Sequence, residues 1–309
     1  MGSVAQDAVA ALEQLCPGGV RRNEPLARHV TFRIGGPADV LVLPRSLDTL
    51  SACAAWLYRE GLPFVVLGRG SNVLIADRGV RGVVIKTGRG QESVRYEGSD
   101  VIAECGASLP QLSRATAARG LAGLEFAAGI PGSVGGGIFM NAGAHGCALS
   151  EVVRMVRVLT PSGERTWSRE EMGFRYRQSR VQAERSVVLE ATLNLKPADP
   201  RVCIERLDSW LRTRSDTQPL GPPSSGCIFR NPVGDHAGRL IDVSGGKGMH
   251  IGGAVVSDRH ANYILNTGGA TAAEVVRLIA DVRARVQDRS GIALEPEIKL
   301  IGEFELGGL

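Results

Sequence analysis

The chain has 309 residues, which is enough for two or three packed units that each bury a hydrophobic core. Charged residues make up 22% and the net charge is only +4, without any run of basic residues, so a nucleic-acid partner is not expected. No apolar stretch is long enough to span a membrane, and no secretory signal is recognisable, so we expect a cytoplasmic protein. The six cysteines are spread singly along the sequence, so we expect reduced thiols and no metal site.

The first third of the chain predicts alternating helices and strands. Residues 3–15 are expected to form a short amphipathic helix, because apolar side chains recur on one face. Residues 31–44 predict a pair of strands around a Gly-Gly turn. Ser46 is expected to cap a helix that runs to Glu60 and ends at Gly61. Further elements are predicted as strands at 63–68, 82–87 and 101–108 and as a helix at 109–119.

The remainder continues this irregular alternation, which is typical of the α+β class. Strands are predicted at 152–159, 164–168 and 186–195. A proline-containing change of composition at 197–200 predicts a domain boundary, and it divides the chain into an N-terminal lead-in, a first domain and a C-terminal domain at 1–30, 31–197 and 198–309. Helices are predicted at 200–213 and 271–288, and the closing stretch 293–304 predicts a strand after its proline. Thr271 and Glu274 form a capping box at the start of the second helix.

Glycine is unusually frequent, with 40 residues in a chain where an average usage of about 7% would give half as many. Residues 68–72, Gly-Arg-Gly-Ser-Asn, directly follow an apolar strand. Their backbone amides can bind a phosphate, although a plain tight turn fits them equally well. The clusters at 129–137 and 141–144 contain more glycines than turns need, and they indicate backbone close to a nucleotide cofactor. Neither G-x-G-x-x-G nor G-x-x-x-x-G-K-[ST] occurs, so a Rossmann or P-loop site is excluded.

Cys227 lies in the stretch "PSSGCIFRNP", and its residue type alone leaves several roles open. A thiol there fits core packing, half of a disulfide, a metal ligand, a nucleophile or an acid. The nucleophile interpretation is the weaker one, because no histidine is positioned by the sequence to activate the thiol.

Seven motifs make the sequence recognisable. In chain order they are "TFRIGGPAD", "LGRGSNVLIAD", "GLEFAAGIPGSVGGGIFMNAGAHG", "GFRYRQSR", "SSGCIFRNP", "AGRLIDVSGGKGMHIGGAVVSDRHANYILNTGGATAAEV" and "LEPEIKLIGEF". Together they resemble the bacterial UDP-N-acetylenolpyruvoylglucosamine reductase family over residues 31–304. The length of the chain is similar to that of the shorter members, which lack a tyrosine-bearing insertion.

The resemblance implies a flavoenzyme with a fold of the vanillyl-alcohol-oxidase type. FAD is expected to bind non-covalently in two subdomains of the first domain, and the C-terminal α+β domain is expected to hold the substrate. NADPH is the implied reductant. The implied product is UDP-N-acetylmuramate, made from the enolpyruvyl ether of UDP-N-acetylglucosamine in a cytoplasmic step of peptidoglycan synthesis, which serves cell shape and division.

The resemblance also implies three catalytic residues. Arg177 is expected to pair with the enolpyruvyl carboxylate, and Arg175 nearby is expected to face the other side of a strand. Glu297, rather than Glu295, is expected beside the reacting carbons, either to help polarise them or to hold Arg177 and the substrate in place. Cys227 matches the proton donor, where many members have serine; an ordinary thiol pKa of about 8.5 keeps such a donor mostly protonated at neutral pH.

Further residues are assigned to ligands by the same resemblance. The expected FAD-binding residues are Gly68, Arg69, Gly70, Ser71, Asn72, Gly129, Ile130, Pro131, Gly132, Ser133, Gly136, Asn141 and Gly143. The expected substrate-binding residues are Arg177, Gln218 and Asn231, with Arg214 as a possible helper. Arg239, Asn262 and His145 lie in matching motifs without an assigned contact.

Two other functions remain open at this stage. A different FAD-dependent oxidoreductase on the same scaffold would share the glycine loops but would not need Arg177, Cys227 and Glu297 together. A non-catalytic binding protein would be expected to lose at least one of the three, and this chain has an acceptable residue at each position.

Overall fold

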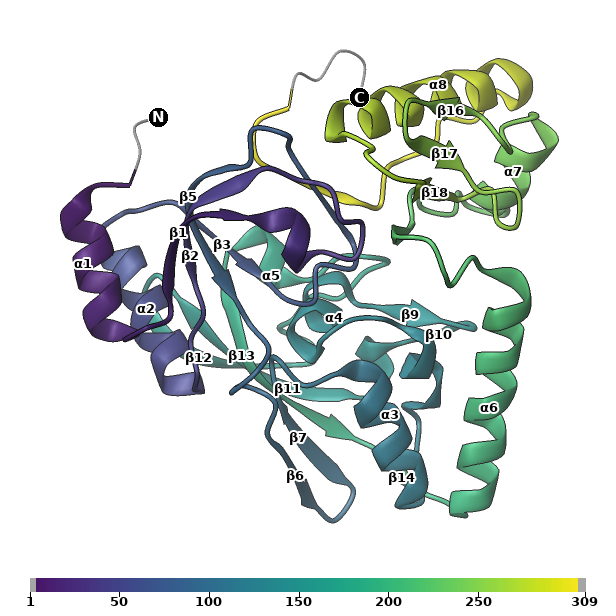
Figure 1. The fold of residues 1–309 in the computed structure, drawn as a ribbon. Coiled ribbons are helices and arrows are strands. Elements are labelled where there is room, and N and C mark those ends of the chain that lie inside the picture. The colour runs from purple at the N-terminus through teal and green to yellow at the C-terminus, as the bar shows by residue number, and fades with distance from the viewer. Residues whose placement is uncertain (1–3, 305–309) are drawn as a thin grey trace.

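A computed structural model describes residues 4–304. Its N-terminal part contains a four-stranded sheet (Figure 1). The strand order is β1 (Val20–Pro25), β2 (Pro37–Val42), β5 (Val80–Lys86) and β3 (Phe64–Leu67). β1 and β2 are antiparallel, whereas β2, β5 and β3 run parallel. Helices α1 (Gln6–Leu15) and α2 (Leu47–Arg59) pack against each other beside this sheet.

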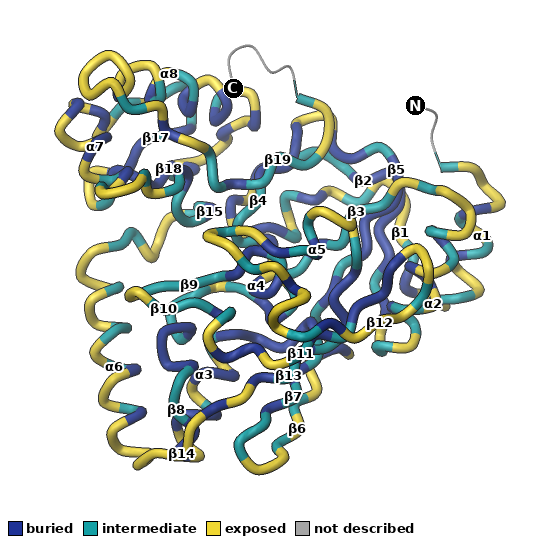
Figure 2. The backbone as a smooth tube through the Cα atoms, turned by 180° about the vertical axis from the view of Figure 1, so that it is seen from behind, coloured by how far each residue is buried: buried dark blue, intermediate teal, exposed yellow. Residues whose placement is uncertain are grey.

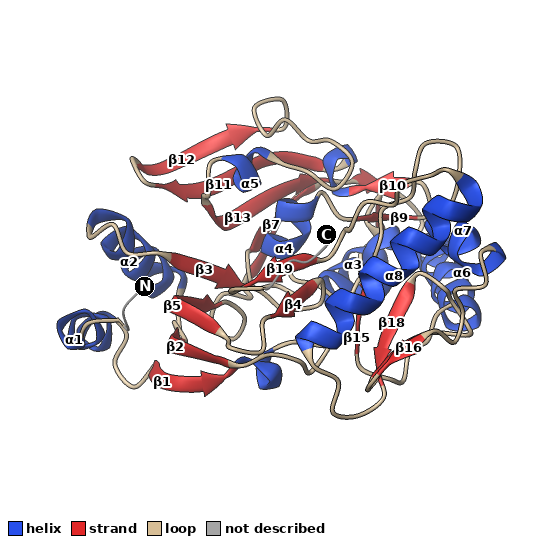
Figure 3. Cartoon of the chain, turned by 90° about the horizontal axis from the view of Figure 1, so that it is seen from above, coloured by secondary structure: helices blue, strands red, loops and turns tan. Residues whose placement is uncertain are grey.

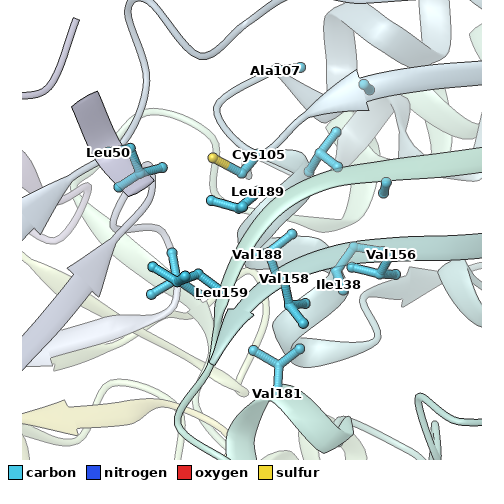
Figure 4. Packing of buried hydrophobic residues seen from close by; sticks show 14 of the residues in the cluster. Leu50, Cys105, Ala107, Ile138, Val156, Val158, Leu159, Val181, Val188 and Leu189 are labelled. Atoms are coloured by element: carbon cyan, nitrogen blue, oxygen red, sulfur yellow. The ribbon is translucent and has the colours of Figure 1, made fainter. Parts of the chain in front are cut away.

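A second sheet of five antiparallel strands lies below the first in Figure 1. Its order is β12 (Gly163–Ser168), β11 (Val153–Thr160), β13 (Val187–Asn194), β7 (Asp100–Glu104) and β6 (Val94–Glu97). One apolar core joins this sheet to α2 and to the first sheet. Figure 4 shows part of this core, to which Leu50 of α2, Val158 of β11 and Leu189 of β13 all contribute. From Leu189 onward, alternate residues of β13 are buried, as expected for a strand with one covered face.

The C-terminal part has its own sheet, in the order β15 (Ser224–Cys227), β18 (Tyr263–Asn266), β17 (Ala254–Val256) and β16 (His250–Ile251). Helices α7 (Ala237–Val243) and α8 (Ala272–Ser290) cover it and bury a separate core. Helix α6 (Pro200–Thr217) leads into this part, and most of its surface is exposed in Figure 2. Among residues 4–304, no helix has the length and hydropathy of a membrane span.

Two features connect the C-terminal part to the earlier sequence. β19 (Lys299–Ile301) pairs in parallel with β4 (Val73–Ile75), and Figure 3 shows the two strands side by side. Phe32, Ile34 and Leu74 are buried in the core under α8. The two parts therefore share backbone pairing as well as apolar contacts.

Shorter elements complete the chain. They are helices α3 (Leu109–Ala118), α4 (Val134–Met140) and α5 (Arg180–Ala183), the paired strands β8 (Leu121–Ala122) and β14 (Lys196–Pro197), the hairpin of β9 (Gly143–Ala144) and β10 (Cys147–Ala148), and the 3₁₀ turns Leu26–His29, Glu125–Gly129 and Leu149–Glu151. Helix α4 lies within the stretch of small residues for which no element was predicted.

The structure confirms the α+β class and most of the expected elements. Ser46 accepts a hydrogen bond from the Thr49 amide at the start of α2, and Thr271 forms the predicted capping box with Glu274 at the start of α8. Helix α6 is four residues longer than expected, since it ends at Thr217. β1 lies in the expected lead-in, yet it is part of the first sheet. The proposed division at 30 and 197 remains a prediction.

The predicted strand pair at 31–44 is wrong. Only residues 37–42 form a strand, β2, and its antiparallel partner is β1 rather than residues 31–36. The glycines serve a close approach instead of a hairpin turn, because a Cβ atom on Gly36 would lie 2.1 Å from the carbonyl oxygen of Asp77. Gly35 has a φ of 138°, which ordinary residues rarely adopt.

Candidate active site

A cleft of about 1090 Å³ lies between the first two sheets and the C-terminal part. One part of its lining, here called the glycine end, is formed by residues 68–72, which follow β3, and residues 130–136, which lead into α4. A second part, here called the charged end, contains Arg177, Cys227 and Glu297, and it adjoins the first part at Asn72, whose carbonyl oxygen accepts from the Lys299 amide. These three residues come from three distant parts of the sequence.

The loop at 68–72 presents backbone amides to the cleft. The amides of Arg69, Gly70 and Ser71 have no hydrogen-bond acceptor among residues 4–304. Successive amides of this kind form a concave site for an anion, because each N–H carries partial positive charge. The loop is also packed tightly against its neighbour, since a Cβ atom on Gly68 would lie 2.7 Å from Ser133 Oγ. This geometry favours phosphate binding over a simple turn.

The glycines before and within α4 divide into two kinds. A Cβ atom on Gly137 would lie 2.7 Å from Leu149 and 2.8 Å from Leu109, so Gly137 is needed for packing. A Cβ atom on Gly132 or Gly136 would meet no protein atom closer than 3.6 Å, and neither glycine has a positive φ. A side chain at Gly132 or Gly136 would instead occupy the cleft, so both positions leave room for a ligand. The cleft therefore fits an extended cofactor such as FAD.

Arg177 and Glu297 form an ion pair at the charged end. Arg177 Nε donates to Glu297 Oε1 at 2.8 Å, and Arg177 Nη2 donates to the carbonyl oxygen of Gly143 at 3.1 Å. Their side chains are 19% and 12% exposed, so the pair is largely buried. Within the described part of the chain, Arg177 Nη1 has no partner and remains available to a ligand. Burial raises the pKa of Glu297, and the Arg177 cation acts in the opposite direction.

The strand expected around Arg175 and Arg177 is wrong. Residues 175–178 form a turn closed by hydrogen bonds between Arg175 and Gln178, and Arg177 has a φ of 57°. The turn points Arg177 into the cleft and leaves Arg175 exposed. Glu295 and Glu297 do have different surroundings, because the Glu295 side chain is 73% exposed and pairs with Arg230.

Cys227 is the last residue of β15 and lines the cleft. Its thiol is free, and no group of metal-ligating side chains occurs in the described residues. Burial raises the pKa of the Cys227 thiol to about 11, and the nearby Glu297 carboxylate adds to this effect. The thiol is therefore protonated at neutral pH more completely than its ordinary pKa would give.

Four other residues line the charged end that the sequence did not single out. They are Gln182, Ser225, Tyr263 and Lys299. Lys299 Nζ donates to Gln182 Oε1 at 3.0 Å, and burial lowers the pKa of Lys299. Lys299 could have been found as the residue two positions beyond Glu297, where β19 begins. Tyr263 shows no such signal, since only strand pairing brings it to Cys227.

Some expected ligand-binding residues have protein partners instead. Asn141 ends α4 with a left-handed φ of 41°, and its side chain bonds the Arg175 carbonyl and the Ser150 amide. Asn231 Oδ1 accepts from the Ala237 amide at 3.1 Å, where α7 begins. Neither asparagine lines the cleft. Their expected contacts to ligands remain predictions.

The residues without an assigned contact also have structural partners. His145 stacks on Trp210 of α6 with ring centroids 5.0 Å apart. Arg239 pairs with Asp235, and Asn262 exchanges two hydrogen bonds with the Phe229 backbone next to β15. Asn262 therefore fixes the segment that follows Cys227.

A basic groove of about 1500 Å³ adjoins the cleft. It is lined by Arg21, Arg28, Arg33, Arg45, Arg69, Lys86, Arg89 and Arg214, whereas Glu92 is the only acidic residue that residues 4–304 contribute to it. Gly129, expected at the cofactor, lies in this groove rather than in the cleft. Arg69, Ser71, Arg214 and Tyr263 line both spaces, so the groove is continuous with the cleft. Such a surface attracts anionic ligands.

This fold and cleft define an FAD-dependent oxidoreductase, and comparisons with known proteins specify its family. A model described as an FAD binding domain matches residues 38–169, and a model of the UDP-N-acetylenolpyruvoylglucosamine reductase C-terminal domain matches residues 218–301. A reductase of that name from Bacillus licheniformis is 43% identical over 96% of this chain and 98% of its own length. The one from Heliobacterium modesticaldum is 46% identical over 91% of this chain and 90% of its own length.

A solved structure agrees with these matches. The crystal structure of the Thermus caldophilus reductase superposes on this chain with a TM-score of 0.78 and is 34% identical in sequence. The alignment covers 91% of this chain and 98% of the Thermus chain. The chain belongs to the UDP-N-acetylenolpyruvoylglucosamine reductase family.

Proposed function

We propose that the protein uses NADPH to reduce the enolpyruvyl ether of UDP-N-acetylglucosamine to UDP-N-acetylmuramate. The observation that carries this proposal is the meeting of Arg177, Glu297 and Cys227 at one end of a glycine-lined cleft, in a chain of this family. FAD, when bound, supplies the hydride that passes from the reductant to the substrate. The protein's own residues must then hold the substrate, stabilise charge and deliver a proton.

The glycine end is the part that would hold FAD. The free amides of residues 69–71 would bind its diphosphate, and the space beside Gly132 and Gly136 admits an extended ligand. The continuous basic groove would attract the diphosphates of the substrate and of NADPH. These features account for a nucleotide cofactor and nucleotide ligands without a Rossmann motif.

Arg177 would bind the substrate carboxylate. Its Nε and Nη2 are held by Glu297 and Gly143, and its Nη1 is free to donate to the ligand. Hydride addition to the enolpyruvyl group places negative charge next to that carboxylate, and a fixed guanidinium stabilises the charge as it develops. Glu297 would then act mainly by orienting Arg177.

Cys227 would supply the proton. Its raised pKa keeps the thiol protonated, so Sγ–H is available to the carbon that carries the developing charge. A nucleophilic role would instead require a thiolate, which this pKa disfavours. The reaction would serve peptidoglycan synthesis, and with it cell shape and division. The six free thiols and the nucleotide substrates support a cytoplasmic location.

The visible spectrum of the purified protein tests the proposal. We expect yellow protein that releases FAD on denaturation, loses its flavin absorbance when NADPH is added, and regains it when the enolpyruvyl substrate follows. Colourless protein that cannot take up FAD would contradict the cofactor assignment. Loss of colour with NADPH but no recovery with this substrate would favour another FAD-dependent oxidoreductase.

A further inference from the structure

Tyr263 lies directly opposite Cys227 on the neighbouring strand. The two residues are cross-strand partners in the pairing of β15 with β18, and both line the charged end of the cleft. Directly opposite residues of an antiparallel pair bring their side chains together on one face. Tyr263 is only 4% exposed, so its hydroxyl needs partners within this site.

The Tyr263 hydroxyl lies between Gln218 and Cys227. It donates its proton to Gln218 Oε1 at 2.7 Å, and the Cys227 side chain approaches it from the paired strand β15. A phenol has one proton to donate, so while that proton points to Gln218 the oxygen can only accept from the thiol. At rest the phenol proton therefore points to Gln218 Oε1, and the Tyr263 oxygen faces the Cys227 Sγ–H group as an acceptor.

This arrangement changes when Cys227 acts as an acid. The Sγ–H bond breaks, a C–H bond forms on the substrate, and the electron pair stays on sulfur as a thiolate. A thiolate can only accept hydrogen bonds, and a hydrogen bond to an ion is roughly twice as strong as a neutral one. The Tyr263 proton therefore gains by turning from Gln218 to the sulfur. Burial raises the pKa of Tyr263, so the phenol itself stays protonated throughout.

We propose that Tyr263 is a positioning residue for Cys227, whose hydroxyl holds the resting thiol and then donates to the thiolate. The inference rests on Cys227 being the proton donor of the proposed function. The thiolate regains its proton from solvent, so no redox step is involved. The charged groups that also act on Cys227 are Glu297, Arg177 and Arg214, and a change at Tyr263 leaves all three in place.

The first test measures alkylation of Cys227 in the FAD-loaded protein without substrate. Iodoacetamide reacts with thiolates, and mass spectrometry of the Cys227 peptide relative to the partly exposed Cys147 peptide gives a ratio within each sample. We expect Tyr263→Phe to lower this ratio about tenfold, because the thiolate loses its donor. A cleft that is merely loosened by the substitution would raise the ratio through better access, so an unchanged or higher ratio would overturn the proposal.

Gln218→Leu provides a test of opposite sign. Without Oε1 the Tyr263 proton has only the sulfur to turn to, and labelling of Cys227 should increase. Tyr96→Phe is the matched control, since Tyr96 lies on β6 under Arg119 and does not line the cleft. We expect it to leave the ratio unchanged. If Gln218→Leu lowered the labelling ratio of Cys227 to Cys147, as Tyr263→Phe is expected to do, the proposed role of the Tyr263 proton would be wrong.

The second test measures turnover. Tyr263→Phe should lower kcat about tenfold, enlarge the solvent deuterium isotope effect and leave KM for the enolpyruvyl substrate nearly unchanged. NADPH oxidation with ferricyanide as acceptor should stay at the wild-type rate, because it needs no carbon acid. Wild-type protein without reductase activity would overturn the proposed function, while the alkylation ratio would still decide whether Tyr263 stabilises the thiolate.

Discussion

The glycine end and the charged end of the cleft use different chemical groups of the chain. The glycine end presents main-chain amides and leaves out side-chain atoms at Gly132 and Gly136. The charged end presents side chains, and Arg177, Glu297 and Cys227 each have particular partners. The first end is therefore sensitive to added atoms, whereas the second is sensitive to removed or altered groups. The following substitutions test that difference.

The largest effect is expected from removing the thiol. Cys227→Ala should lower turnover of the enolpyruvyl substrate by about a thousandfold, because a general acid contributes on the order of 10² to 10⁴. NADPH oxidation with ferricyanide should remain near normal, which shows that FAD is bound. Cys227→Ser should recover much of the activity. If the alanine variant turns over the substrate like wild type, Cys227 is a packing residue.

Arg177→Lys should be the next most harmful change, although it keeps the charge. An ammonium group cannot reproduce the planar contacts to Glu297 and Gly143 while still binding a carboxylate. We expect a loss of about a hundredfold in kcat/KM, the usual effect of removing one donor to a developing anion. Arg175→Lys is the matched control on the exposed side of the same turn. Equal kcat/KM values for the two variants would remove Arg177 from the site.

Two adjacent glycines of α4 should separate cofactor binding from folding. Gly136→Leu places a side chain in the cleft and should weaken FAD binding about tenfold or more, with little change in the Tm of FAD-free protein. Gly137→Leu meets Leu149 and Leu109 and should lower that Tm. Fluorescence titration with FAD and thermal melts measure the two effects. Similar behaviour of the two variants would mean that Gly136 does not face the cofactor.

The smallest effect concerns pH. Cys227 can donate a proton below the pKa of its thiol, and this ability is lost as the pH rises through that pKa. Burial raises the pKa of the Cys227 thiol to about 11. An ordinary thiol would begin to lose activity near its pKa of about 8.5. We therefore expect the ratio of wild-type to Cys227→Ser rates to stay constant between about pH 7 and pH 9.5. A decline of this ratio centred on the ordinary thiol pKa would contradict the raised value.

The sequence predicted those parts of the fold that local chemistry specifies. The caps at Ser46 and Thr271 are local hydrogen bonds, so the starts of α2 and α8 were predictable. The segment 31–36 was not, because its glycines pack against residues 75–79, and β2, its expected strand partner, pairs with β1 instead. Tertiary contacts therefore determine the conformation of residues 31–36.

The candidate site shows the same limit at the level of residues. Sequence similarity selected Arg177, Cys227 and Glu297, and all three do line the cleft. Similarity could not foresee the left-handed turn that directs Arg177, the burial that raises the pKa of Cys227, or Tyr263 opposite it. Asn141 and Asn231 are engaged by protein groups, and no pattern in the sequence distinguishes such an asparagine from one that binds a ligand.

The pairing of β19 with β4 has a consequence for the order in which the site is made. Glu297, next to β19, lies 120 residues after Arg177, its ion-pair partner. Synthesis on the ribosome proceeds from the N-terminus, and domains fold as they emerge. The glycine loops are therefore complete long before the ion pair can form. A growing chain has no functional charged end until β19 has been translated and has joined β4, so a partly made molecule cannot turn over substrate.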